Sequence, residues 1–186
     1  SACLVGSEMC IRDSRLLDAV LATTGMEQAI VFMSTKLSTE DQAGRLREAG
    51  HAVAALHGDL PQHARNRVVR MLLEGRIQIV VATDVAARGL DIKDVPAVFN
   101  FDIPFNAEDY VHRIGRTGRA GASGEAVSLV CLDEEGFMME IERFTKQEIP
   151  VQILEGFGPE PGEKAEPIAM GRQTLWGGSG RPPSRD

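Results

Sequence analysis

The sequence predicts a single α/β domain, an open parallel sheet with helices on both faces, followed by a flexible tail. Two observations predict this fold. Short apolar runs alternate with amphipathic stretches along most of the chain, which is typical of strands joined by crossover helices. The first amphipathic stretches also begin at hydroxyl or proline residues and stop at glycine, as helices do. With 186 residues, 43% of them apolar, the chain is long enough for one packed core.

Each expected element has its own local pattern. The strands are short apolar runs, at residues 29–33, 52–56, 78–82, 97–100 and 125–132. The helices alternate with them, at residues 39–49, 61–74, 107–114 and 134–145. The first helix has a Ser/Thr start, the second is opened by Pro61, and Gly50 and Gly75 follow them where a left-handed cap is needed. In such a sheet, ligands usually bind beyond the carboxyl ends of the strands.

The two ends of the chain differ from the domain, which we expect at residues 14–158. The string CLVGSEMCIRDS, at residues 3–14, resembles sequencing-adapter read-through, so residues 1–13 are expected to be a non-native or disordered leader. Glycine, proline and charged residues dominate from Pro159 onward, which predicts a flexible tail over residues 159–186.

Composition excludes several classes of protein. No run approaches the roughly 18–20 apolar residues of a membrane span, and the N-terminus lacks the order of a signal peptide, so we expect a cytoplasmic location. The three cysteines show no CxxC spacing or paired histidines, so neither a zinc site nor a disulfide framework is indicated. Cys131 lies in an apolar run and is expected to be buried.

The net charge of −7 argues at first against a nucleic-acid partner, but the charges are unevenly distributed. Residues 57–121 hold nine Lys/Arg and eight Asp/Glu, whereas residues 122–170 hold three against eleven. Eight of the nine basic residues in the first stretch are arginine, the residue best suited to planar, bidentate phosphate contacts. A local phosphate-binding surface is therefore compatible with the overall acidity.

The densest group of functional residue types lies at residues 110–121, YVHRIGRTGRAG. Arg113, Arg116 and Arg119 recur every third residue with glycines between them, so they can converge on one polyanion. Guanidinium groups placed against a γ-phosphate neutralise the charge that spreads over its oxygens. This accelerates phosphoryl transfer by roughly 10³–10⁵-fold. The alternative is a solvated basic turn whose arginines pair with the acids of this region: Asp102, Glu108 or Asp109.

Two further segments place polar groups next to strands or helix ends. In VATDVAARGLDI, at residues 81–92, Thr83 is suited to a backbone phosphate and Asp91 to a ribose hydroxyl. Alternatively, Asp84 caps a short helix and Asp91 pairs with Arg88. In HGDLPQHARNR, at residues 57–67, a glycine turn runs into a helix N-terminus, which attracts phosphate, and Gln62 and Arg65 share one helix face.

Together these segments resemble the C-terminal RecA-like lobe of DEAD-box ATP-dependent RNA helicases. The motifs HRIGRTGRAG, ATDVAARGLDI, HGDLPQHAR and IVFMSTK occur in the order and spacing of that family, and the resemblance covers roughly residues 16–173. The later stretches GEAVSLVCLDEEG and KAEPIAMGRQ are similar to the bacterial RhlE group.

The resemblance implies a role for each matching residue. Arg116 and Arg119 would act as arginine fingers toward the γ-phosphate of ATP. Asp91 would contact the ribose, while His112 and Arg113 would help to link the nucleotide and RNA sites. The RNA backbone would be held by Thr35, Gly58, Arg65 and Thr83, and Gln62 and Arg88 would join these loops across the lobe.

The chain lacks the GxxxxGK[ST] loop and the Asp-Glu-Ala-Asp box of a complete helicase. The resemblance therefore implies that ATP and Mg²⁺ are bound mainly by an N-terminal RecA-like lobe, the partner that closes with this lobe on RNA. Two alternatives stay open: a DNA helicase or translocase with the same fold, and a non-enzymatic module that docks RNA or a protein.

Overall fold

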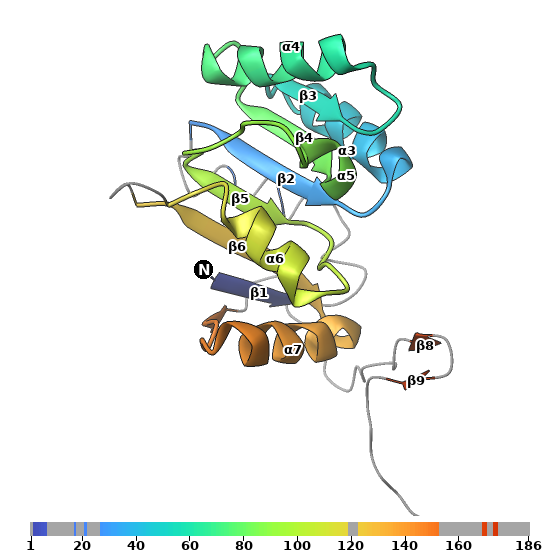
Figure 1. Ribbon diagram of the computed structural model, residues 1–186, viewed down its shortest axis with the longest axis vertical. Helices are drawn as coiled ribbons and strands as arrows, with labels where there is room; N and C mark the ends of the chain where they lie inside the picture. Colours follow the sequence, from blue (N-terminus) through green and yellow to red (C-terminus); the bar gives the residue numbers. More distant parts are fainter. Residues whose placement is uncertain are drawn as a thin grey trace, which may run out of the picture.

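The computed structural model describes residues 2–6, 17, 21, 27–118, 123–152, 169–170 and 173–174. Its main feature is a parallel sheet with the strand order β3-β4-β2-β5-β6-β1-β7 (Figure 1). In chain order these strands are β1 (Ala2–Gly6), β2 (Ala29–Met33), β3 (Val53–Leu56), β4 (Ile79–Thr83), β5 (Ala97–Asn100), β6 (Glu125–Cys131) and β7 (Val151–Gln152). The predicted open parallel sheet, with all five expected strands, is confirmed.

The sheet extends beyond β6 through a strand that lies within residues 1–13. Ala2–Gly6 pairs in parallel with β6, from Ala2 opposite Val127 to Gly6 opposite Cys131, and with β7 on its other side. These five residues therefore form a strand of the sheet, and the non-native origin expected for residues 1–13 stays a prediction. The rest of residues 1–13 lies outside the described residues, and so does the predicted tail, except for an antiparallel pair of β8 (Ala169–Met170) and β9 (Gln173–Thr174).

The described helices are α3 (Lys36–Glu48), α4 (Gln62–Leu73), α5 (Asp84–Ala87), α6 (Ala107–Ile114) and α7 (Glu135–Thr145), with the 3-10 turn η1 (Leu132–Glu134) before α7. The predicted start of α3 was three residues late, because Thr35 caps it: the Thr35 hydroxyl accepts from the Ser38 N–H at 3.1 Å, and the Ser38 hydroxyl accepts from the Thr35 N–H. Gly50 and Gly75 have positive φ angles of 96° and 70°, which confirms the predicted left-handed caps.

The two faces of the sheet bury different side chains of the same strands, as the twofold repeat of a strand requires. On β2, Ala29, Val31 and Met33 pack with α3, whereas Ile30 and Phe32 pack with α4 and α5 on the opposite face. A third cluster joins α6 and α7 around Val130 of β6. Helices thus cover both faces, as predicted.

Two smaller expectations concern the interior and the membrane. Cys131 is buried in the core, as predicted. Among the described helices, none is both long enough and apolar enough to cross a membrane.

Candidate functional site

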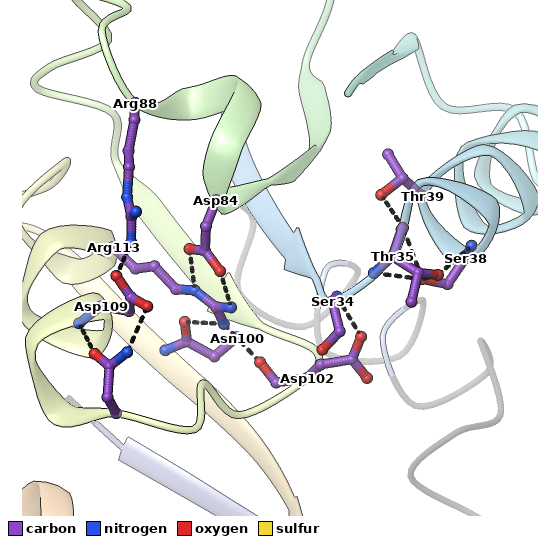
Figure 2. A network of polar contacts seen from close by, with 11 residues as sticks. Ser34, Thr35, Ser38, Thr39, Asp84, Arg88, Asn100, Asp102, Asp109 and Arg113 are labelled. Atoms are coloured by element: carbon purple, nitrogen blue, oxygen red, sulfur yellow. Dashed lines mark hydrogen bonds and ion pairs between the residues drawn. The ribbon is translucent and has the colours of Figure 1, made fainter. Parts of the chain in front are cut away.

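The candidate site lies where β2, β4 and β5 end side by side. Because these strands are parallel neighbours, the residues that follow them meet at one edge of the sheet. Ser34 and Thr35 follow β2, Asp84 follows β4, and Asp102 lies just beyond β5. The Ser34 N–H donates to Oδ2 of Asp102 at 2.7 Å, which ties the first of these loops to the third (Figure 2).

Arg113 of α6 is the centre of this edge and is only 2% exposed. Its Nε and Nη2 donate to the two carboxylate oxygens of Asp84 at 2.7 and 2.6 Å (Figure 2). Its Nη1 donates to the Asp102 carbonyl oxygen at 2.6 Å and to Oδ1 of Asn100 at 3.3 Å. The guanidinium carbon lies 5.1 Å from the ring centroid of Phe32, close enough for a cation–π contact.

This geometry excludes two of the alternatives left open by the sequence. Asp84 is not a helix cap, because Thr83 occupies the N-cap of α5 and the Asp84 carboxylate binds Arg113. A solvated basic turn is also wrong for Arg113, because its guanidinium is buried and its ion-pair partner is Asp84. A buried charge is tolerated only when it is paired and hydrogen-bonded, and here both conditions hold.

A second ion pair joins α5 and α6 closer to the surface. Arg88, at the end of α5, pairs with Asp109, whose carboxylate also accepts from the Asn106 side chain at 2.8 Å. The proposed Arg88–Asp91 pair is wrong, since Asp91 instead forms an ion pair with Lys93 at 2.5 Å. Arg88 therefore connects the end of α5 to α6, and its expected role in joining the RNA-binding loops stays a prediction.

Arg116 lies at the end of α6 and holds the segment that follows α5. Its Nη1 donates to the carbonyl oxygens of Leu90 and Ile92 at 2.9 and 3.3 Å, and its Nη2 donates to that of Ala87 at 3.2 Å. The side chain also borders a pocket between the two motifs, lined by Arg88, Gly89, Val111, His112, Gly115 and Arg116. Arg119 lies outside the described residues.

The residues expected to hold RNA lie on the loops after β2, β3 and β4. Arg65 of α4 folds back on its own loop, and its Nη2 donates to the Gly58 carbonyl oxygen at 3.0 Å. Thr83 is buried at the end of β4, while Thr35 is exposed and caps α3. Gln62 was expected to join loops across the lobe, but its side-chain amide donates to Asn66 in the same helix.

An exposed ion pair links α3 to the loop after β3. The Lys36 ammonium donates a hydrogen bond to Oδ2 of Asp59 at 2.6 Å. This hydrogen bond and the charge of Lys36 lower the pKa of the Asp59 carboxyl below its ordinary value of 3.8, with a smaller contribution from His57. Nearby, Nε2 of His57 lies 2.6 Å from Oε1 of Glu40, so the same loop is tied to α3 twice.

Sequence patterns did not single out Asn100, the Asp102 carbonyl or Phe32 as parts of the site. The only local signal was Asn100 itself, a polar residue at the end of the apolar run AVFN. Among the described residues, no group of three or more His, Cys, Asp or Glu side chains could hold a metal ion.

Comparison with known proteins identifies the class of this domain. The sequence matches the helicase conserved C-terminal domain over residues 12–121, and the chain belongs to that family. Among individual proteins, it is 41% identical over 169 residues to the ATP-dependent RNA helicase RhlB of Vibrio parahaemolyticus. That alignment covers 88% of this chain and 39% of the relative, so the chain spans about two fifths of its length.

Solved structures agree with this assignment. The Escherichia coli DEAD-box protein SrmB, bound to regulator of ribonuclease activity A, superposes with a TM-score of 0.80 at 36% identity, covering 88% of this chain and 96% of that one. Saccharomyces cerevisiae Dbp5 bound to RNA and ADP BeF3 gives a TM-score of 0.74 at 30% identity, covering 82% of this chain and 41% of that one. The likeness to the RhlE group stays a prediction, because the two relatives at 41% and 49% identity are RhlB helicases.

Proposed function

We propose that this chain is the C-terminal lobe of an ATP-dependent RNA helicase, which separates or remodels short RNA duplexes by hydrolysing ATP. The observation that carries the proposal is the buried Arg113–Asp84 pair, which binds α6 to α5. Because the pair holds the two motifs together, the side chains of Arg88, His112 and Arg116 border one pocket at the edge of the sheet. A single polyanion at that pocket would meet positive charge from both motifs.

Arg116 and Arg119 are the residues that we assign to the γ-phosphate. ATP and Mg²⁺ would be bound mainly by the N-terminal lobe and supply the phosphoryl group and its counter-charge. The guanidinium of Arg116 at present donates to three backbone carbonyl oxygens. We assign Asp91 to the ribose, because its carboxylate is largely exposed beside the same segment.

We assign the RNA backbone to the loops that carry Thr35, Gly58, Arg65 and Thr83. These residues follow neighbouring strands or begin the helices after them, so one strand of nucleic acid can run along the edge of the sheet. Contacts to phosphates and 2′-hydroxyls carry no base information, so recognition would be independent of sequence. The bound RNA and ADP BeF3 of Dbp5 support this choice by analogy. A cytoplasmic location belongs to the same proposal.

The test uses the two-lobe protein, with its native N-terminal lobe preceding this chain. We expect RNA to stimulate ATP turnover more than DNA of the same sequence does. Arg116→Ala should lower kcat by roughly 10³-fold or more, because the developing charge on the γ-phosphate loses a guanidinium. Arg76→Ala is the matched control, since Arg76 is an exposed arginine paired with Glu74 after α4, and it should leave turnover unchanged.

The outcomes separate the alternatives. Stimulation by DNA alone would identify a DNA-directed enzyme. No ATP turnover with either nucleic acid, in a protein that still binds RNA, would identify a non-enzymatic module.

A further inference from the structure

Two buried polar side chains, Asn100 and Ser128, form a pair on the strands behind the candidate site. They lie opposite each other on β5 and β6, and both are fully buried at 0% exposure. A buried polar group without a hydrogen bond is destabilising. Two polar side chains buried opposite each other therefore indicate a specific role. We propose that Asn100 and Ser128 are positioning residues, which orient Arg113 and through it the arginine at 116. The proposal rests on the proposed function.

The neighbours of Asn100 determine which way its side-chain amide faces. Arg113 carries only N–H donors, so the atom that Asn100 turns toward it must be the carbonyl oxygen Oδ1. The amide nitrogen Nδ2 then points the other way and needs an acceptor. The Ser128 Oγ provides one at 3.1 Å. Ser128 thus selects the amide orientation in which Asn100 can accept from Arg113.

The orientation of the Arg113 guanidinium is fixed at both of its ends. Asp84 binds the Nε and Nη2 edge of Arg113, and the Nη1 end is held by the Asp102 carbonyl and the Asn100 Oδ1. Four hydrogen bonds within one buried plane leave Arg113 a single orientation. A guanidinium enclosed in this way is not available to a nucleotide. We therefore assign Arg113 a positioning role, in place of the direct link between the nucleotide and RNA sites that the resemblance implied.

Arg113 is connected to Arg116 through the short helix α5. Arg113 holds Asp84, and Asp84 is the first residue of the short helix α5. The same helix ends at Ala87, whose carbonyl oxygen accepts from Arg116. Arg113 lies in the last turn of α6, and Arg116 lies two residues beyond the end of that helix. A rotation of Arg113 would therefore shift α5 and α6 relative to each other and move Arg116 at the pocket.

A purely structural role for the pair is the competing explanation, and Ser128→Ala separates the two. The substitution removes one oxygen and leaves Nδ2 of Asn100 without its acceptor. Cys131→Ala is the matched control, because it removes one sulfur from a buried position of the same strand outside the network. Ser128→Thr keeps the hydroxyl and should restore the wild-type behaviour.

The first measurement uses this chain alone and needs no enzymatic activity. The Nε–H signal of Arg113 is assigned in the NMR spectrum by its loss in Arg113→Lys, and its exchange with solvent is then followed. We expect exchange to become roughly tenfold faster in Ser128→Ala, the factor for losing about one net hydrogen bond, and to stay unchanged in Cys131→Ala. Equal exchange rates in these two variants would overturn the proposal.

The second measurement is ATP turnover by the two-lobe protein. Ser128→Ala should lower kcat while KM for ATP stays the same, because a displaced arginine acts on the transition state more than on substrate binding. Equal loss in Ser128→Ala and Cys131→Ala, or no rescue by Ser128→Thr, would mean that the pair only stabilises the sheet. Absence of turnover in the wild type would count against the proposed function instead, and the exchange measurement would still decide the role of Ser128.

Discussion

Arg113 shows how one buried charge can organise a site. Taking a guanidinium out of water is strongly unfavourable unless its donors are satisfied. Here a carboxylate, a backbone carbonyl and a side-chain amide come from the ends of β4 and β5, and the Phe32 ring covers one face. Removing the arginine would leave several of these partners buried and unsatisfied, which is more harmful than losing a surface ion pair.

Arg113→Ala is accordingly expected to lower the free energy of unfolding by about 3 kcal/mol, the lower end of the range for breaking a buried pair, because Asp84 is 24% exposed. Arg88→Ala breaks a pair whose arginine is 56% exposed and should lower it by less than about 1 kcal/mol. Urea unfolding of the two variants measures the difference. A larger loss for Arg88→Ala would show that the outer pair holds α5 and α6 together.

Asp59 provides a prediction about pH. Its pKa in the folded chain lies below 3.8, so the Lys36–Asp59 ion pair contributes fully above the ordinary pKa and is lost as the pH falls through the lowered one. We expect Lys36→Met to raise the titration midpoint of Asp59 toward 3.8, as measured by NMR of the side-chain carboxyl. An unchanged midpoint would mean that Lys36 does not hold this carboxylate in solution.

At the scale of elements, the turn after α6 lies in close contact with Gly124, the residue before β6. A Cβ added to Gly124 would overlap Oγ1 of Thr117 and the backbone nitrogen of Gly118. Only glycine permits this close approach, and Gly118 itself has a positive φ of 67°. Thr117 and Gly118, which follow Arg116, can therefore lie directly against the backbone of Gly124 because Gly124 has no side chain.

Gly124→Ala should therefore destabilise the domain and displace the turn, because backbone atoms must move apart. Gly44→Ala is the matched control: Gly44 lies within α3 with nothing near its missing Cβ, and alanine there should stabilise by roughly 0.5–1 kcal/mol. Thermal unfolding of both variants shows whether each substitution raises or lowers the stability. Equal stabilisation by both substitutions would show that the turn has room to relax.

For the whole molecule, the distribution of charge sets what the chain can do alone. Its net charge is −7, yet residues 57–121, which include most segments of the candidate site, hold nine basic residues against eight acidic ones. A polyanion approaching that edge would meet favourable charge locally and a repulsive field from the acidic remainder. Binding by this chain alone should therefore be weak and depend strongly on salt.

We expect the isolated chain to have negligible ATPase activity and to bind single-stranded RNA with an affinity that falls as salt increases. Arg65→Ala should reduce the slope of log K against log[salt] by about 0.7, the value for one phosphate contact on a single strand. Arg45→Ala removes an exposed arginine on α3 that pairs with Asp41, and should leave the slope unchanged. Fluorescence anisotropy with labelled RNA measures both. Robust ATP turnover by this chain, abolished by Arg116→Ala, would show that the catalytic parts lie elsewhere.

The sequence by itself determined the succession along the chain of the five predicted strands and four predicted helices, and the edge at which the site lies. Apolar runs, Pro61, Gly50 and Gly75 are local signals, and parallel strands bring their carboxyl ends together whatever the details. The start of α3 was misplaced because the capping box at Thr35 precedes the amphipathic pattern. Only the tertiary structure decided the partners of the buried and bridging arginines: Arg88 with Asp109, and Arg113 with Asp84 and Asn100. The physical reason is that residues far apart in sequence pair only when packing brings them together and removes water from them. The spacing of residues along the chain does not show which distant residues will meet in this way.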